Sequence, residues 1–296
     1  MAQPATREVS GEPATLPLYV KAALPVLPGV SLLPGIRKTG QALPDLTLTR
    51  HDVPIRRDHV TAYAGVCGFR MRDAVPVTYP HVLAFPLHLA LMTDADFPFP
   101  AIGLVHVENS ITQHRAISAD EALQVTARAE RLRAHPKGQV FDIVTRVHSA
   151  GELVWEETSS MLRRGGVSGA ADADQGRELA LVPPSGPVWR VPGDLGRAYA
   201  GVSGDRNPIH LYALTAKALG FPRQIAHGMW SKARCIAALE GRLPEAVRVD
   251  VVFKKPVVLP GKVAFGSRRG DHGDYEFSLT SPRSGAPHLL GRGAPA

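Results

Sequence analysis

The sequence lacks the features that define several large classes of protein. Only two cysteines, Cys67 and Cys235, occur in 296 residues, and no Cys-x-x-Cys pair is present. A disulfide framework is therefore excluded, and nothing indicates a zinc or redox site. Aromatic residues are only 6% of the chain, and none alternates with basic residues as in a nucleic-acid-binding surface. No basic segment followed by an apolar run opens the chain, so we expect no secretory signal and a cytoplasmic protein.

Long uninterrupted apolar runs are also missing. Of two uncharged stretches, residues 22–36 are too short to span a bilayer as a helix and contain three prolines. Residues 74–93 are long enough, but three prolines with His81 and His88 favour a buried segment of a globular protein over a membrane span. Residues 16–34 suit either a packed N-terminal arm or contact with a membrane surface, and we favour the arm.

Length and charge set broad limits on the rest. The 296 residues equal about two average domains, and a hydrophobic fraction of 44% is ordinary for a globular protein. Lys and Arg number 34 against 27 Asp and Glu, which gives a net charge of +7. This excess favours anionic partners without choosing among nucleic acid, a phosphorylated cofactor and an acidic protein. Because the basic residues are spread along the chain, we do not expect nucleic-acid binding.

One segment of the chain occurs twice. Residues 63–70, Tyr-Ala-Gly-Val-Cys-Gly-Phe-Arg, return at 199–206 as Tyr-Ala-Gly-Val-Ser-Gly-Asp-Arg. Each copy is followed by an apolar stretch typical of a buried helix and then by strands with alternating polarity. The sequence therefore predicts a duplicated α+β unit. We expect its strands at residues 104–111, 123–132, 139–148 and 153–162, and again at 247–253, 262–269, 274–281 and 288–292.

Composition also predicts where the two copies meet. Residues 165–176 are small or polar with no hydrophobic period, and three prolines follow between positions 183 and 187, as in a flexible linker. We therefore expect an N-terminal arm (1–50), a first repeat (51–165), a linker (166–187) and a second repeat (188–296).

The second copy runs directly into the segment that contains the main candidate functional residues. Asn207 before Pro208 indicates a helix start, because Asn caps helices and Pro suits the first turn. His210 then lies in that first turn, and Asp205 in the loop before it can converge with His210 on one cleft. Such residues are often only caps and turn formers. The first copy, however, has Phe69 where Asp205 stands, and a carboxylate in one copy alone indicates a specialised role.

This segment resembles the motif of the MaoC-like hydratases and dehydratases, a hot-dog fold family. The motif joins an aromatic, an apolar and a small residue to Gly-Asp-x-Asn-Pro-apolar-His and a later small residue. It is filled by Tyr199, Val202, Ser203, Gly204, Asp205, Asn207, Pro208, Ile209, His210 and Ala216. The resemblance is strong over residues 190–265. With the degenerate first copy it implies a double hot-dog fold, in which two long central helices are wrapped by antiparallel sheet.

The resemblance also implies an activity, the reversible hydration of trans-2-enoyl thioesters to (R)-3-hydroxyacyl thioesters in fatty-acid metabolism. Asp205 and His210 would be the catalytic pair, Asn207 and Ser203 would position the water or His210, and the Gly228 amide would bind the oxyanion. The residues expected to bind substrate are His227, Arg206, Tyr199, Phe69 and Phe85. No metal or cofactor is implied, because coenzyme A or the pantetheine of an acyl carrier protein is part of the substrate.

The first repeat lacks this machinery, since Phe69, Met71 and Ala74 occupy the places of Asp205, Asn207 and His210. We expect it to form an uncharged wall for the acyl tail, because a degenerate half has no charge to hydrate. A long or bulky acyl group is then favoured over a short one.

Other interpretations remain open at this point. The enzyme could act as a dehydratase on acyl carrier protein in fatty-acid or mycolic-acid elongation, or the chain could bind acyl groups without catalysis. A hot-dog thioesterase would need a differently placed carboxylate. An iron site at Asp205, His210 and His227 is disfavoured, because their spacing is not a known ligand pattern. The duplicated chain can be a monomeric pseudo-dimer, or it can form a further homodimer.

Overall fold

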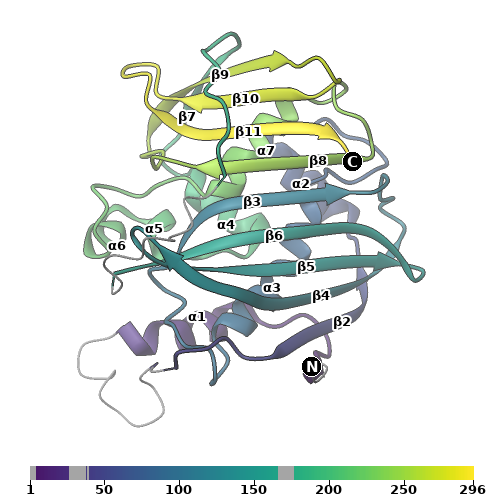
Figure 1. The fold of residues 1–296 in the computed structure, drawn as a ribbon, viewed down its shortest axis with the longest axis vertical. Coiled ribbons are helices and arrows are strands. Elements are labelled where there is room, and N and C mark those ends of the chain that lie inside the picture. Colours follow the sequence, from purple (N-terminus) through teal and green to yellow (C-terminus); the bar gives the residue numbers. More distant parts are fainter. Residues whose placement is uncertain (1–4, 27–37, 39, 166–176) are drawn as a thin grey trace.

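The computed structural model describes residues 5–26, 38, 40–165 and 177–296, and they form one eleven-stranded sheet. Helices α2, α3, α4 and α7 lie behind this sheet in the view of Figure 1. The strands are β1 (Ala5–Glu8), β2 (Leu46–Pro54), β3 (Val105–Gln113), β4 (Ala122–His135), β5 (Gly138–Ser149), β6 (Glu152–Arg164), β7 (Val188–Val191), β8 (Val247–Phe253), β9 (Gly261–Arg269), β10 (Tyr275–Thr280) and β11 (Pro287–Pro295). The helices are α1 (Thr15–Ala23), the 3₁₀ turn η1 (Leu24–Val26), α2 (Arg57–Cys67), α3 (Tyr79–Met92), α4 (Leu195–Ser203), α5 (Pro208–Leu211), α6 (Ala213–Ala218) and α7 (Gly228–Ala238).

The order of the strands confirms the predicted duplication. It runs β1-β2-β4-β5-β6-β3-β8-β11-β10-β9-β7, so each strand from β2 to β6 has a counterpart at the same distance from the centre. All eight predicted strands are present, whereas β1, β2 and β7 were not predicted. Only β1 and β2 pair in parallel, and the other pairs are antiparallel.

The repeated segment has a structural explanation. Its two copies end α2 and α4, and in each copy the glycine that follows, Gly68 or Gly204, adopts a left-handed conformation with φ of 84° and 72°. Only glycine takes that conformation without strain, so both helices stop at the same point. Tyr63 and Tyr199 are buried, and their ring centroids lie 6.3 Å apart. Most of the repeated residues therefore end and pack a helix, which leaves the difference at Asp205 as the informative one.

The central helix of the first half is α3, which lies in the uncharged stretch 74–93. All its residues are buried except Leu83 and Ala90, which confirms the prediction of a buried segment. A helix that is apolar on every side is stable only in the interior of a domain. No helix among the described residues is long and apolar enough to cross a membrane.

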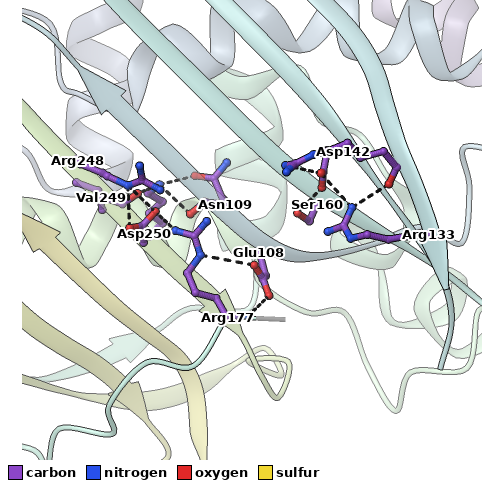
Figure 2. Close-up of polar contacts among 11 residues, drawn as sticks. Glu108, Asn109, Arg133, Asp142, Ser160, Arg177, Arg248, Val249 and Asp250 are labelled. Carbon is purple, nitrogen blue, oxygen red and sulfur yellow. Dashed lines mark hydrogen bonds and ion pairs between the residues drawn. The ribbon is translucent and has the colours of Figure 1, made fainter. Parts of the chain in front are cut away.

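The two halves join where β3 pairs with β8, in a register that runs from Glu108↔Val252 to Gln113↔Val247. Arg177 strengthens this junction, as Figure 2 shows. Its backbone N–H donates to Glu108 Oε1 at 2.6 Å, and its guanidinium pairs with Asp250 on β8. One residue from the inter-repeat segment thus contacts a carboxylate on each of the two central strands.

The predicted domain limits fall at several places in this fold. The arm limit at residue 50 falls inside β2, whose first residues already pair with β4. Residues 166–176 of the predicted linker lie outside the described residues, as do residues 1–4, 27–37 and 39 of the predicted arm. The described part of the arm includes α1, which contacts α3.

Candidate active site

The loop after α4 holds Asp205 by local contacts. Ser203 Oγ accepts a hydrogen bond from the Asp205 N–H at 3.2 Å, and the Asn207 N–H donates to Asp205 Oδ1 at 3.0 Å. The Asn207 side chain accepts from the Ile209 N–H at 3.4 Å and caps α5, with Pro208 in its first turn. Ser203 and Asn207 therefore position the carboxylate and the short helix that carries His210, as these residue types in this order predicted.

His210 is held from its other side. Its Nδ1 lies 2.8 Å from the carbonyl oxygen of Ile225, so Nδ1 carries the proton and donates it. In the neutral ring Nε2 then has its lone pair available. A Cβ at Gly196 would lie 1.8 Å from the backbone oxygen of His210, so only glycine lets α4 approach the catalytic turn this closely.

His227 completes a compact cluster. Its Nε2 donates to the backbone oxygen of Asp205 at 3.0 Å, and its ring stacks on His210 with centroids 3.7 Å apart. A carboxylate oxygen of Asp205 and ring nitrogens of both histidines lie within 4.8 Å of one another. This separation allows one water to bridge Asp205 and His210. His227 Nδ1 is buried and has no hydrogen-bond partner in the described part of the chain.

A residue that sequence reasoning missed also contacts the carboxylate. The Tyr19 hydroxyl donates to Asp205 Oδ1 at 2.7 Å, and Tyr19 belongs to α1, 186 residues away. Burial, followed by the charge of Asp205, raises the pKa of Tyr19 well above its ordinary value, so the hydroxyl keeps its proton. Oδ1 therefore accepts from Tyr19 and from Asn207, which leaves Oδ2 available for a ligand. No local pattern around Tyr19 signals this role.

Burial and the attraction between the two side chains set the charge states of Asp205 and His210. Burial alone would raise the pKa of Asp205, but His227, His210 and the hydrogen bond from Tyr19 outweigh it, and the pKa of Asp205 is lowered. Burial lowers the pKa of His210, although Asp205 partly opposes this effect. At neutral pH the site therefore holds an ionised carboxylate beside a neutral imidazole, which suits general acid–base chemistry.

Gly228 is the first residue of α7, directly after His227. The backbone N–H groups of a helix start have no partner within the helix and favour negative charge. A Cβ at Gly228 would lie 3.0 Å from the ring of Phe253, so a side chain at this position would displace either the helix start or that ring. Gly228 thus presents its backbone amide at a helix start, and its predicted role as an oxyanion donor stays a prediction.

These groups open on a cavity of about 480 Å³ lined by both halves of the chain. Tyr199, Phe85 and His227 line it, as expected of substrate-binding residues. The other two expected residues do not lie on it in the described structure. Phe69 stacks on Tyr63 in the core, with ring centroids 6.3 Å apart, because the Gly68 turn directs the chain inward. Arg206 lines a second cavity, of about 300 Å³.

The prediction of an uncharged wall in the first half is wrong, because four charged residues of that half line the cavity: Glu108, Arg133, Lys137 and Arg164. Polar rings lie on it as well. His81, His88 and His106 line the cavity beside Phe85 and Met92. Glu157, which is buried, lies behind His81 and hydrogen-bonds to it. The motif comparison missed this cluster because its members are widely separated in the chain and do not correspond to the catalytic motif.

Five lysine and arginine residues also line this cavity: Arg133, Lys137, Arg164, Lys254 and Lys255. Lys254 and Lys255 are exposed and belong to the second half. The other three come from the first half. Part of the positive charge of the chain therefore surrounds this one cavity, where it attracts anionic groups.

The donor set of Asp205, His210 and His227 is also that of a metal site. Some of these donor atoms already make hydrogen bonds within the protein. Asp205 Oδ1 accepts two of them, and His227 Nε2 donates to a carbonyl. This arrangement is better suited to holding a water molecule and moving its proton than to binding a cation.

Two sheet-wrapped helices with an acid–base pair and a helix N-terminus on one shared cavity define a hot-dog protein with a hydratase-type site. The family described as MaoC-like domain matches residues 191–276. The chain is 41% identical over 259 residues to 3-hydroxyacyl-thioester dehydratase X of Mycobacterium tuberculosis, which covers 87% of this chain and 91% of that protein. The chain therefore belongs to the MaoC-like family.

Solved structures agree with this assignment. The crystal structure of HtdX from Mycobacterium tuberculosis matches with a TM-score of 0.76 and 39% identity, over 84% of this chain and 100% of that chain. A conserved hypothetical protein of the same species with a double hotdog fold matches with a TM-score of 0.53 over 82% of this chain and 92% of its own. At 14% identity it shares the fold alone. The predicted double hot-dog fold is confirmed.

Replacing Tyr19 by Phe should lower kcat by about tenfold and move the acid limb of kcat/KM to higher pH. The carboxylate loses a hydrogen bond to its charged form, so its pKa rises and Oδ1 is held less firmly. Rates measured from pH 4 to pH 9 on a thioester substrate check this. Tyr212→Phe, which changes a tyrosine that is 56% exposed, is the control. An unchanged pH profile in Tyr19→Phe would show that α1 does not contact the site in solution.

Replacing Gly228 by Ala should lower kcat by about 10²-fold or more, because the added methyl meets Phe253 and displaces the amide that binds the oxyanion. Gly201→Ala is the matched control, since a Cβ at Gly201 in α4 meets nothing within 4 Å. That control should retain activity and be slightly more stable. Equal kcat values in the two variants would exclude Gly228 as the oxyanion donor.

Acid should destabilise the fold well before carboxylates titrate. Burial lowers the pKa of His88 to about 4 and that of His106 and His227 to about 3, whereas histidine in an unfolded chain titrates near pH 6.5. Between these values the unfolded state binds more protons, so stability falls as pH falls, by as much as about 1.4 kcal/mol per pH unit for each histidine. Urea unfolding between pH 7 and pH 4.5 measures this slope. It should be smaller in His106→Phe, and equal slopes in the two proteins would show that burial of neutral His106 is not a cause of the acid sensitivity.

Proposed function

We propose that the chain is a hydro-lyase that interconverts trans-2-enoyl thioesters and (R)-3-hydroxyacyl thioesters. The observation that carries this proposal is the pairing of an ionised Asp205 with a neutral His210 on one cavity, at a separation that one water can bridge. The relative from Mycobacterium tuberculosis named 3-hydroxyacyl-thioester dehydratase supports the reaction class, and the family supports the (R) configuration.

In the hydration direction, one water lies between Asp205 Oδ2 and His210 Nε2. His210 accepts a proton from this water as its oxygen bonds to C3, and the C2=C3 double bond is lost. A proton is then returned to C2 on the same face. The Ile225 carbonyl keeps Nδ1 of His210 protonated, so the proton moves at Nε2, and Asp205 stabilises the imidazolium that forms.

Negative charge develops on the thioester oxygen during this step. The Gly228 N–H at the start of α7 is the donor for it, and because it is part of the backbone it does not reorganise during the reaction. Dehydration runs through the same groups in reverse, so the site serves both directions and the carrier and metabolite levels decide between them.

The cavity supports a long acyl group as the substrate. Its volume of about 480 Å³ lies in the range of ligand sites, and it extends from the catalytic pair into the first half. Coenzyme A and acyl carrier protein both present phosphate, which Lys137, Arg164, Lys254 and Lys255 can attract. A dehydratase acting on acyl carrier protein in fatty-acid or mycolic-acid elongation is therefore the second candidate.

The proposal also includes a cytoplasmic location and activity as a single chain. Both cysteines are free and buried, as expected in a reducing cytoplasm. Both halves line the cavity, so one chain can act as a pseudo-dimer without a partner, and a further homodimer is not required for the chemistry. A non-catalytic acyl-binding role is less well supported, because it gives no reason for a charged carboxylate at the cavity.

Asp205→Asn tests the activity directly. Hydration of a long trans-2-enoyl-CoA should fall by about 10³-fold or more, because a neutral amide cannot stabilise the imidazolium that forms on His210, and Asn can still accept the hydrogen bond from Tyr19. Circular dichroism and the thermal midpoint should show an intact fold. The chiral product from the unmodified chain should be (R). Retained activity in the variant, or an (S) product, would refute the assignment.

A further inference from the structure

A second buried cluster lies on the cavity, in the half that lacks the catalytic motif. His81 of α3 directs Nδ1 at Glu157 of β6, at 2.8 and 2.9 Å from its two oxygens. Asn109 of β3 donates to the same carboxylate at 2.5 Å and to Ser159 Oγ at 3.0 Å. Lys232 of α7 donates to Asn109 Oδ1 and, at 3.0 Å, to the carbonyl of Val249. A chain of hydrogen bonds thus runs from the helix of the second half to His81.

The charges in this cluster are balanced internally. The histidines and the hydrogen bond from Asn109 outweigh burial and lower the pKa of Glu157 to about 2. Lys232 is fully buried, which lowers its pKa to about 7, while Glu157 opposes that effect. Glu157 is therefore a carboxylate at neutral pH, linked through Asn109 to an amine that is only partly protonated there. Such a buried pair gains little stability over apolar residues of the same size, so packing alone does not account for it.

The chain of hydrogen bonds between Lys232 and His81 determines which atoms of the cluster remain available to bind a ligand. A carboxylate only accepts hydrogen bonds, so His81 Nδ1 is the donor to Glu157 and Nε2 is the remaining polar atom of the ring. His106 of β3 stacks near it, with centroids 6.5 Å apart and planes at 22°. His106 Nε2 is buried without a hydrogen-bond partner among the residues described. Both rings line the cavity, and these two nitrogens are the polar atoms of the rings that Glu157 does not engage.

We infer that His81 and His106 form a second binding subsite, which recognises a hydroxyl group on the acyl chain of the substrate. A hydroxyl can donate to the Nε2 lone pair of the neutral His81 ring and accept from His106 Nε2 in the tautomer that carries the proton on that atom. Phe85, Met92 and Leu104 line the same cavity and pack against the methylene groups of the chain. The inference rests on the proposed action on acyl thioesters and specifies the acyl group.

A cation fits this cluster less well. His81, His88 and Glu157 have donor atoms within 4.8 Å of one another. However, Glu157 is already bonded to His81 and Asn109, and His88 Nε2 lies 2.7 Å from Thr145 Oγ1. A divalent ion would break these hydrogen bonds and would lie near the ammonium of Lys232. A neutral hydroxyl requires none of these changes.

The test compares acyl chains with and without a terminal hydroxyl. Pairs of trans-2-enoyl-CoAs of equal and rising length, one plain and one ω-hydroxylated, move the hydroxyl along the cavity. At one length kcat/KM should favour the hydroxylated chain by about tenfold or more, because the plain chain leaves the buried nitrogens unpaired. A ratio at or below one at every length would overturn the inference. An ω-oxo series, which only accepts hydrogen bonds, should show a smaller preference.

Variants show whether the cluster causes that preference. In His81→Leu and in His106→Phe the ratio should fall towards one, whereas His114→Leu, a histidine outside the cavity, should keep it. Since the ratio is independent of the amount of folded enzyme, a merely structural role would not change it. His106 Nε2 has no described partner to lose, so His106→Phe remains informative if His81→Leu does not fold. A ratio unchanged in His106→Phe would exclude the subsite.

Equilibrium binding of the saturated chains by calorimetry separates this inference from the proposed function. Tighter binding of the hydroxylated chain without turnover of any enoyl thioester would support the subsite and refute the hydro-lyase. Turnover with equal affinity for both chains would support the hydro-lyase and refute the subsite. Failure of both chains to bind would refute both.

Discussion

The antiparallel pairing of β3 with β8 is the contact on which the rest of this structure depends. It joins a six-stranded and a five-stranded half into one sheet, places α3 and α7 on the same face, and so encloses a cavity that is lined by both halves. Arg177 reinforces it through Glu108 and Asp250. Because of this pairing, Asp205 and His210 of the second half and His81 of the first half line one cavity.

Burial of charge is the second constraint. Asp205 on one side of the cavity and Glu157 on the other are both ionised, and each is stabilised by histidines and by hydrogen bonds from neighbouring elements. A buried carboxylate persists only where such partners are fixed in place. The two clusters use these partners differently. Around Asp205 they leave Oδ2 and His210 Nε2 available to a water, whereas around Glu157 they orient His81 towards the cavity.

The loop from Ser203 to His210 could be interpreted from the sequence because its geometry is local. Gly204 ends one helix, Asn207 and Pro208 start the next, and these signals act over neighbouring residues. Eight of the eleven described strands were predictable for the same reason, since alternation is a local pattern. Tyr19 was missed because its contact spans 186 residues. Phe69 was misplaced because the sequence shows that it replaces Asp205 but not that its ring turns into the core against Tyr63.

The sequence by itself determined the duplication, most of the strands in each half, and the turn from Ser203 to His210, because each depends on local periodicity and on turn-forming residues. The tertiary structure alone decided what surrounds the cavity in the first half. The missing motif residues of the first repeat predicted an uncharged wall there, yet α3, β3, β6 and α7 bring His81, Asn109, Glu157 and Lys232 together from distant positions. Charges that are too costly to bury singly can be buried together, and only the folded chain shows which of them meet.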